Sequence, residues 1–119
     1  MEIRVRTRGV VDTLEFRGRP EASNVSVLRD RVQALIEAGE PLLVLDLSRV
    51  SDLDSAWLGE LVACRERVRK HHGVIKIVAV QGPRDLLVAS GLDRLFEIYP
   101  DEEQALDSFS PESETAGVP

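Results

Sequence analysis

The stretch of residues 42–62 constrains the fold of this chain most strongly. It begins with an apolar run, Leu42–Leu47, which only Asp46 interrupts. Such a run predicts a strand buried on both faces, in the middle of a sheet with helices on each side. A loop follows, and a helical pattern opens at Ala56. In α/β proteins the loop after a central strand commonly carries function, because the next helix offers unpaired N–H groups. Ser55 stands at this point.

The composition indicates one domain that needs neither a disulfide nor a metal. The chain has 119 residues, and 43% of them are hydrophobic, which is enough for a single core. Its one cysteine, Cys64, cannot form an intramolecular disulfide, and no Cys/His cluster has metal-ligand spacing, so we expect no metal and no cofactor. No apolar stretch has the length of a signal peptide core or of a membrane span. We therefore predict a soluble cytoplasmic protein without membrane insertion.

The net charge of −6 belongs to the C-terminal end of the chain. Fifteen basic and 15 acidic residues precede Pro100, whereas six acidic residues and no basic ones follow it. This balance argues against nucleic-acid binding, which needs clustered positive charge. We predict a single domain over residues 1–109 and a disordered acidic tail over 110–119, rich in Ser, Pro, Glu, Thr and Gly. The nearest approach to a basic patch is interpreted as a solvated helix face formed by Arg65, Arg67, Arg69 and Lys70.

Hydrophobic periodicity and turn residues predict an α/β fold in the order ββαβαβαβα. The expected architecture is a small mixed sheet of about five strands, flanked by about four helices. A hairpin at the N-terminus gives the antiparallel pair, and each later strand follows a helix and is expected to be parallel to a neighbour. The strands are expected at residues 2–7, 10–16, 42–47, 74–80 and 96–99. The helices are expected from Ser23 or Asn24 to Gly39, at 55–71, at 82–88 and from 101 onward.

The string from Leu45 to Gly59 resembles the signature of STAS domains, especially that of bacterial anti-sigma factor antagonists. In that family a buried strand ending in Asp-Leu-Ser leads through a loop into Asp-Ser-Ser/Thr-Gly-Leu-Gly at a helix start. Three other segments also resemble the family, so that the resemblance covers roughly residues 2–109. They are the turn at 18–21, the glycine and strand from Gly73, and the segment 90–99.

The resemblance implies a regulatory binding module in a partner-switching pathway. In such families the antagonist binds an anti-sigma factor that is also a GHKL-type serine kinase, phosphorylation releases it, and a PP2C-type phosphatase restores it. The resemblance places Ser55 at the phosphoacceptor position, Asp54 as the acid before it and Glu21 near the acceptor. The partner-binding set that it implies is Glu21, Asp52, Asp54, Ala56, Trp57 and Gly59. Ala56 and Trp57 replace the second Ser/Thr and the Gly of the family pattern, and Pro20 replaces the usual Leu.

Several alternatives stay open at this stage. Ser55 is either a phosphoacceptor or a simple N-cap, and Asp54 is an equally good cap. Trp57 is either a core residue or an exposed anchor for a partner. Cys64 is interpreted as inert packing. The rival function is a non-switching STAS scaffold or accessory subunit, in a stressosome-like assembly or a lipid-transport ABC system. The chain is expected to be a monomer or a weak dimer.

An enzyme is disfavoured by the motifs that the chain lacks. The sequence contains no Gly-rich phosphate loop and no nucleophile elbow, and its two histidines are adjacent at a helix end. A response-regulator receiver would need an acidic pair after its first strand, and the chain has none there. We therefore expect a binding module without catalytic residues.

Overall fold

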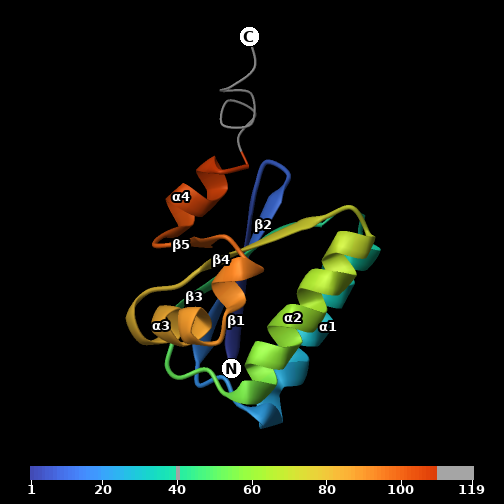
Figure 1. Cartoon of the computed structure of the whole chain (residues 1–119). Helices are drawn as coiled ribbons and strands as arrows, with labels where there is room; N and C mark the ends of the chain where they lie inside the picture. The colour runs from blue at the N-terminus through green and yellow to red at the C-terminus, as the bar shows by residue number, and fades with distance from the viewer. Residues whose placement is uncertain (40, 110–119) are drawn as a thin grey trace.

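A computed structural model describes residues 1–39 and 41–109, and it shows a five-stranded mixed sheet in the spatial order β1-β2-β3-β4-β5. The first pair is antiparallel and the others are parallel. The predicted order and fold class are confirmed (Figure 1). The elements are β1 (Glu2–Arg8), β2 (Val11–Gly18), α1 (Val25–Glu37), β3 (Leu42–Val50), α2 (Ser55–Lys70), β4 (Val74–Val78), α3 (Gln81–Ala89), β5 (Ile98–Tyr99) and α4 (Glu102–Asp107), with short 3-10 turns at Ala22–Asn24 and Leu92–Arg94.

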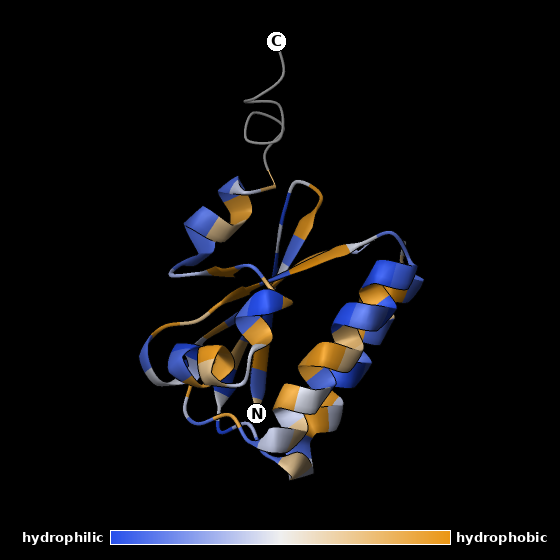
Figure 2. Ribbon diagram, viewed as in Figure 1, coloured by the Kyte–Doolittle hydropathy of each residue, from blue (hydrophilic) through white to orange (hydrophobic). Residues whose placement is uncertain are grey.

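Strand β3 lies in the middle of the sheet and is buried on both faces, as the apolar run predicts. On one face, Leu43, Leu45 and Leu47 belong to the main core, together with the inward stripes of α1 and α2. On the other face, Val44 joins a smaller cluster with Val11, Val78 and Ala105. Figure 2 shows hydrophobic positions along the strands and in bands on the paired helices. The central strand therefore fixes where the loop before α2 emerges.

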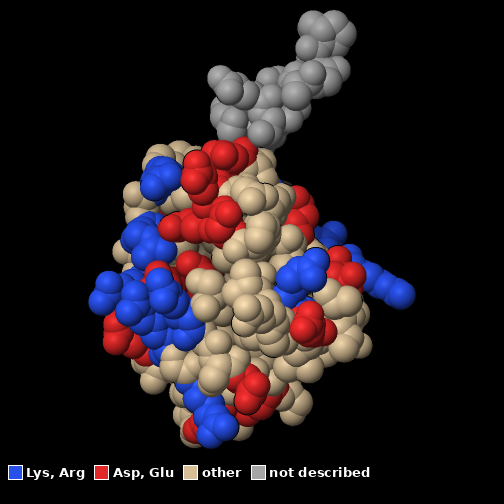
Figure 3. All heavy atoms as spheres, turned by 90° about the vertical axis from the view of Figure 1, so that its left-hand side faces the viewer, with Lys and Arg blue, Asp and Glu red and all other residues tan. Residues whose placement is uncertain are grey.

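The second face of the sheet is covered by the short helix α4, and charges hold that cover in place. Arg6 of β1 donates to Glu15 of β2 at 3.1 Å and to Glu102 of α4 at 3.0 Å. The buried Lys76 of β4 donates to the hydroxyl of Ser108 at 2.7 Å. Acidic side chains gather over α4 on the surface, where the C-terminal part of the sequence carries its negative charge (Figure 3).

Element boundaries differ from the predictions where long-range contacts decide them. Strand β3 continues to Val50, because Gly18 pairs with Val50 beyond a bulge. Strand β4 ends at Val78, and β5 is confined to Ile98–Tyr99 because Phe96 packs into the core. The predicted tail at 110–119 lies outside the described residues. Among the residues that the structure describes, none of the helices is both long enough and apolar enough to cross a membrane.

The start of α1 is also different from the prediction. The 3-10 turn at 22–24 precedes the helix, and neither Ser23 nor Asn24 caps α1 with its side chain. The side chain of Asn24 is instead occupied by three other groups. It donates to the carbonyl of Arg19 and accepts from the backbone N–H of Glu21 and from the indole of Trp57.

Candidate functional site

Helix α2 begins at the end of the loop that leaves the central strand. Asp54 is its N-cap, and the carboxylate of Asp54 accepts the backbone N–H of Trp57 at 3.0 Å. Ser55 is therefore the first helical residue and not the cap, and its side chain is exposed. Of the two caps considered from the sequence, Asp54 is correct. The hydroxyl of Ser55 is thus left without a capping role.

Trp57 lies in the core beneath this helix start. Its side chain is 0% exposed, and its ring meets that of Phe16 edge-on with centroids 5.5 Å apart. The indole N–H donates to Asn24 Oδ1 at 2.8 Å and to the carbonyl oxygen of Glu21 at 3.1 Å. The core interpretation is confirmed, and the exposed anchor is wrong. Trp57 cannot touch a partner directly, but it holds the turn that carries Glu21 against α2.

The contact between Asn24 and Trp57 is a feature that the sequence does not reveal. Asn24 has the pattern of a helix cap, and the two residues are 33 positions apart. The only available signal is that a buried indole N–H needs an acceptor, which does not say which acceptor it finds.

Exposed and half-buried residues lie around Ser55, and we call this region the Ser55 surface. It is defined as Glu21, Asp52, Asp54, Ser55, Ala56 and Gly59, of which Asp54 and Ala56 are half-buried. Glu21 is exposed and is brought to this surface through the Trp57 contact. Gly59 lies one turn after Ser55 on the same helix face, and a Cβ atom there would meet nothing within 4 Å. Trp57, the remaining residue of the predicted partner-binding set, is buried beneath this surface.

The Ser55 surface combines negative side chains with the positive end of a helix. Asp52, Asp54 and Glu21 supply three carboxylates, while the first backbone N–H groups of α2 favour an anion. The N–H of Trp57 is already bound by Asp54, and that of Leu58 by the carbonyl of Asp54 at 3.1 Å. A dianion on Ser55 would therefore meet both attraction from the helix and repulsion from the carboxylates.

The other side chains considered from the sequence are buried or make contacts within the fold. Cys64 is 0% exposed, and burial raises the pKa of its thiol to about 12, so it is an inert core residue as predicted. The interpretation of the last turns of α2 as a solvated face is wrong for two arginines. Arg65 donates to the carbonyl of Leu95 at 2.6 Å, and Arg67 donates to the buried carboxylate of Glu60 at 2.8 Å. In the described part of the chain, no three His, Cys, Asp or Glu side chains come together as a metal site.

Comparison with known proteins agrees with this architecture. Residues 3–98 match the family described as "Mlab, STAS domain". An anti-sigma factor antagonist from Mycobacterium paratuberculosis superimposes with a TM-score of 0.82 and 29% identity, over 90% of this chain and 92% of that one. No curated protein sequence gives a significant match.

Two structures of SpoIIAA share the fold at lower identity. The phosphorylated Bacillus protein matches with a TM-score of 0.71 and 17% identity, over 92% of this chain and 100% of that one. The unphosphorylated anti-sigma factor antagonist SpoIIAA matches with a TM-score of 0.71 and 14% identity, over 91% and 97%. The family match spans most of the described chain, and the observed strand order and helix cover agree with it. This chain therefore belongs to the STAS domain family.

Proposed function

We propose that the protein is an anti-sigma factor antagonist that binds a GHKL-type anti-sigma factor serine kinase through the Ser55 surface. Phosphorylation of Ser55 releases it from that partner, and a PP2C-type phosphatase restores binding. The observation that carries the proposal is that Ser55 is exposed in the first turn of α2. Asp54 caps this helix, and other acidic residues lie nearby. In this function the chain is a binding module and has no catalytic residues.

The effect of the phosphate falls on the interface more than on the fold. A phosphoserine carries roughly −1.5 to −2 charges at neutral pH. The N-terminus of α2 favours such an anion by about 0.3–1 kcal/mol. Asp52, Asp54 and Glu21 oppose it most where a partner excludes water from the surface, because charge repulsion strengthens at low dielectric. About 1.4 kcal/mol is enough to weaken binding tenfold, so this repulsion suffices for release.

The relatives support the proposal. SpoIIAA is described both as an anti-sigma factor antagonist and in a phosphorylated form, which shows that this fold accommodates the modification in that protein. The antagonist from Mycobacterium paratuberculosis extends the same assignment to a protein of 29% identity. The placement of Ser55 in this chain fits the same use.

Labelling tests the site directly. The purified chain is incubated with ATP and with an anti-sigma factor kinase of the same genome that binds it, and phosphate is located by mass spectrometry. We expect one phosphate on Ser55, absent in Ser55→Ala, and unchanged labelling in the control Ser90→Ala, whose serine is exposed at the end of α3. Phosphate that persists in Ser55→Ala contradicts the assignment.

A second candidate is a STAS subunit that binds its partner permanently, as a scaffold or as an accessory subunit of an assembly or transporter. The matching family is described as "Mlab, STAS domain", which names no anti-sigma factor antagonist and requires no switch. Ala56 stands directly after Ser55, where the family pattern has a second Ser/Thr, and this also fits a surface without a switch. Stable binding to a partner that ignores the charge at residue 55 identifies this second function.

A further inference from the structure

A pocket lies at the opposite end of α2 from Ser55, between that helix, the start of β4 and the segment before β5. Its volume is about 240 Å³, and it is lined by Arg65, Arg69, Gly73, Val74, Ile75, Leu95 and Glu97. This is smaller than the roughly 300–1,000 Å³ of pockets that enclose drug-sized ligands. It is large enough for one or two side chains.

The sheet has an open edge at this pocket. Strand β5 pairs only with Ile77 and Val78 of β4. The N–H of Ile77 bonds the carbonyl of Glu97, and that of Val74 bonds Pro41 on the β3 side. Because backbone groups alternate in direction along a strand, the N–H of Ile75 points outward on the same side as that of Ile77. Within the described residues, no partner strand reaches Ile75 on that side.

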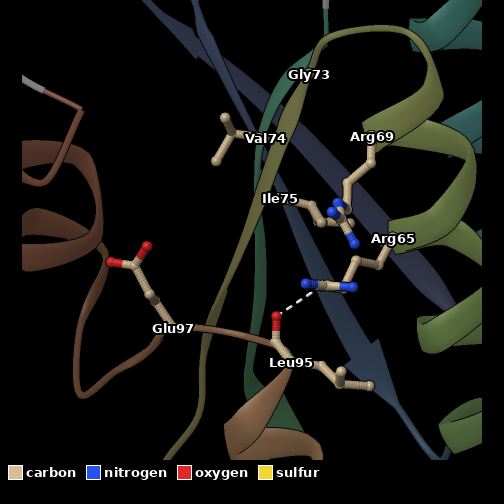
Figure 4. Close-up of a pocket in the computed structure, with 7 residues that line it drawn as sticks. All are labelled: Arg65, Arg69, Gly73, Val74, Ile75, Leu95 and Glu97. Atoms are coloured by element: carbon tan, nitrogen blue, oxygen red, sulfur yellow. Dashed lines mark hydrogen bonds between the residues drawn. The ribbon is translucent and has the colours of Figure 1, made fainter.

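An arginine takes the place of the missing strand bond. If the ladder continued by one step, the carbonyl of Leu95 would be the acceptor for Ile75. Instead, Leu95 accepts the Nε–H of Arg65 at 2.6 Å. Figure 4 shows Arg65 and Arg69 reaching from α2 toward Ile75 on one side of β4, while Val74 and Glu97 point to the other side.

The donors on the α2 side of the pocket exceed the acceptors that the chain supplies. Glu66 accepts from Arg65 at 3.1 Å and lies 3.8 Å from Arg69. A guanidinium has five N–H donors, so both arginines keep donors for a further anion. The side chain of Arg69 is 59% exposed and free to turn toward a ligand, whereas Arg65 is 19% exposed and fixed. The two guanidinium groups suit a carboxylate, and the outward N–H of Ile75 suits a backbone carbonyl.

We propose that this edge pocket binds an extended, acidic segment of a partner protein, which adds a short strand beside the first half of β4. The segment's backbone pairs with Ile75, and a carboxylate side chain on its α2 side lies between Arg65 and Arg69. Alternation along the strand places its neighbouring side chains against Val74 on the other side. This site does not depend on the phosphorylation of Ser55.

Placement of arginines at a helix C-terminus also has a purely structural use, because basic side chains there complement the helix dipole. Charged residues beside a sheet edge also discourage unwanted pairing. Both uses are consistent with the exposed Arg69 in the last turn of α2, but neither requires the outward N–H of Ile75 and a cavity on the same side. A peptide experiment separates them from a binding site.

The test uses the full-length, nitrogen-15-labelled protein and a blocked heptapeptide that alternates valine with glutamate. We expect the Ile75 amide resonance to shift on titration and its exchange with solvent to slow. A heptapeptide alternating valine with lysine serves as the control and is expected to leave Ile75 unchanged. Equal binding of the lysine peptide, or a glutamate peptide that leaves Ile75 unchanged, overturns the proposal.

Charge variants locate the site. Arg69→Glu, at a largely exposed position, is expected to lower the affinity for the glutamate peptide by about tenfold or more. Arg31→Glu makes the same change of charge at an exposed position on α1 and is expected to have little effect. Equal weakening by both variants would show a general charge effect and contradict the proposal.

Two further measurements identify what occupies the edge pocket. Sodium acetate at the same carboxylate concentration is expected to leave Ile75 unchanged, and a matching shift would show a simple anion site instead. Deletion of residues 110–119, which include Glu112 and Glu114, is expected to leave the peptide affinity unchanged. A gain of about tenfold on deletion would name the chain's own C-terminal segment as the occupant and overturn the assignment to a partner.

Discussion

The two ends of α2 differ in charge and in how their side chains are fixed. At the first turn Asp54 caps the helix and Ser55 stays exposed among acids. In the last turns the basic side chains are Arg67, Arg69 and Lys70, and the half-buried Arg67 is held by Glu60. A buried stripe joins the two ends, formed by Trp57, Leu61, Cys64 and Val68, each 0% exposed. The same packed helix therefore carries the surface proposed for modification at one end and the edge proposed for binding at the other.

Removing the indole is expected to have the largest effect, because both ends depend on the stripe. Trp57→Ala is expected to lower the free energy of unfolding by about 3–5 kcal/mol, measured by denaturant titration. Trp57→Phe keeps most of the packing but leaves Asn24 and the carbonyl of Glu21 without their donor, and is expected to lower it by about 1–3 kcal/mol. A loss below about 1 kcal/mol for the alanine variant would contradict the description of Trp57 as a fully buried link.

The free energy of unfolding is expected to fall in acid, because Glu60 holds the arginine side chains of two helices. Glu60 accepts from Arg29 of α1 at 3.0 Å and from Arg67 at 2.8 Å. Burial alone would raise the pKa of Glu60, but the hydrogen bonds from Arg67 and Arg29 outweigh it, and the pKa is lowered from 4.5. The folded state therefore binds this proton less readily than the unfolded state does. The stabilisation is fully present above about pH 4.5 and is lost as the pH falls through the folded-state pKa.

Glu60→Gln tests this link. The variant is expected to unfold more easily at neutral pH by about 1–3 kcal/mol, because Arg67 loses its charged acceptor. It is also expected to show a smaller decrease in the free energy of unfolding between pH 5 and 3 than the wild type. Denaturant titrations at several pH values measure both quantities. Parallel pH curves for the two proteins would show that Glu60 does not contribute to the acid response.

The acids at the other end are expected to differ from one another. Asp54→Ala removes the N-cap of α2 and is expected to lower the free energy of unfolding by about 1 kcal/mol. Asp52→Ala, at an exposed loop position two residues earlier, serves as the matched control and is expected to change it by less than about 0.5 kcal/mol. Equal effects of the two substitutions would contradict the assignment of Asp54 as the cap.

The smallest expected effect is a gain. Gly59→Ala places a methyl group where a Cβ meets nothing within 4 Å and is expected to stabilise the fold by about 0.5–1 kcal/mol. Gly59→Arg is expected to leave the melting temperature close to that of Gly59→Ala. It is also expected to weaken binding of the partner, because the arginine side chain projects from the Ser55 surface. A partner that tolerates Gly59→Arg does not dock on this face of α2.

The sequence predicts the parts of this molecule that depend on local pattern. The apolar run at 42–47 gives the central strand, and the spacing after Asp54 gives a helix that starts at Ser55. The contacts that complete the sites join residues far apart in the chain, such as Trp57 with Asn24 and Arg65 with Leu95. Periodicity carries no information on these pairs, because each side chain has several possible partners until the tertiary packing is fixed. For the same reason a helix face that looks solvated contains Arg67, bound to a buried carboxylate.

We propose that charge at Ser55 acts on the binding of the partner and not on the stability of the fold. Isothermal titration of the anti-sigma factor kinase that binds the wild-type chain measures it most directly, with Ser55→Asp as the variant and Ser90→Asp as the charge control. We expect Ser55→Asp to weaken binding by about tenfold or more and Ser90→Asp to bind like the wild type. Wild-type affinity in a correctly folded Ser55→Asp variant would contradict it.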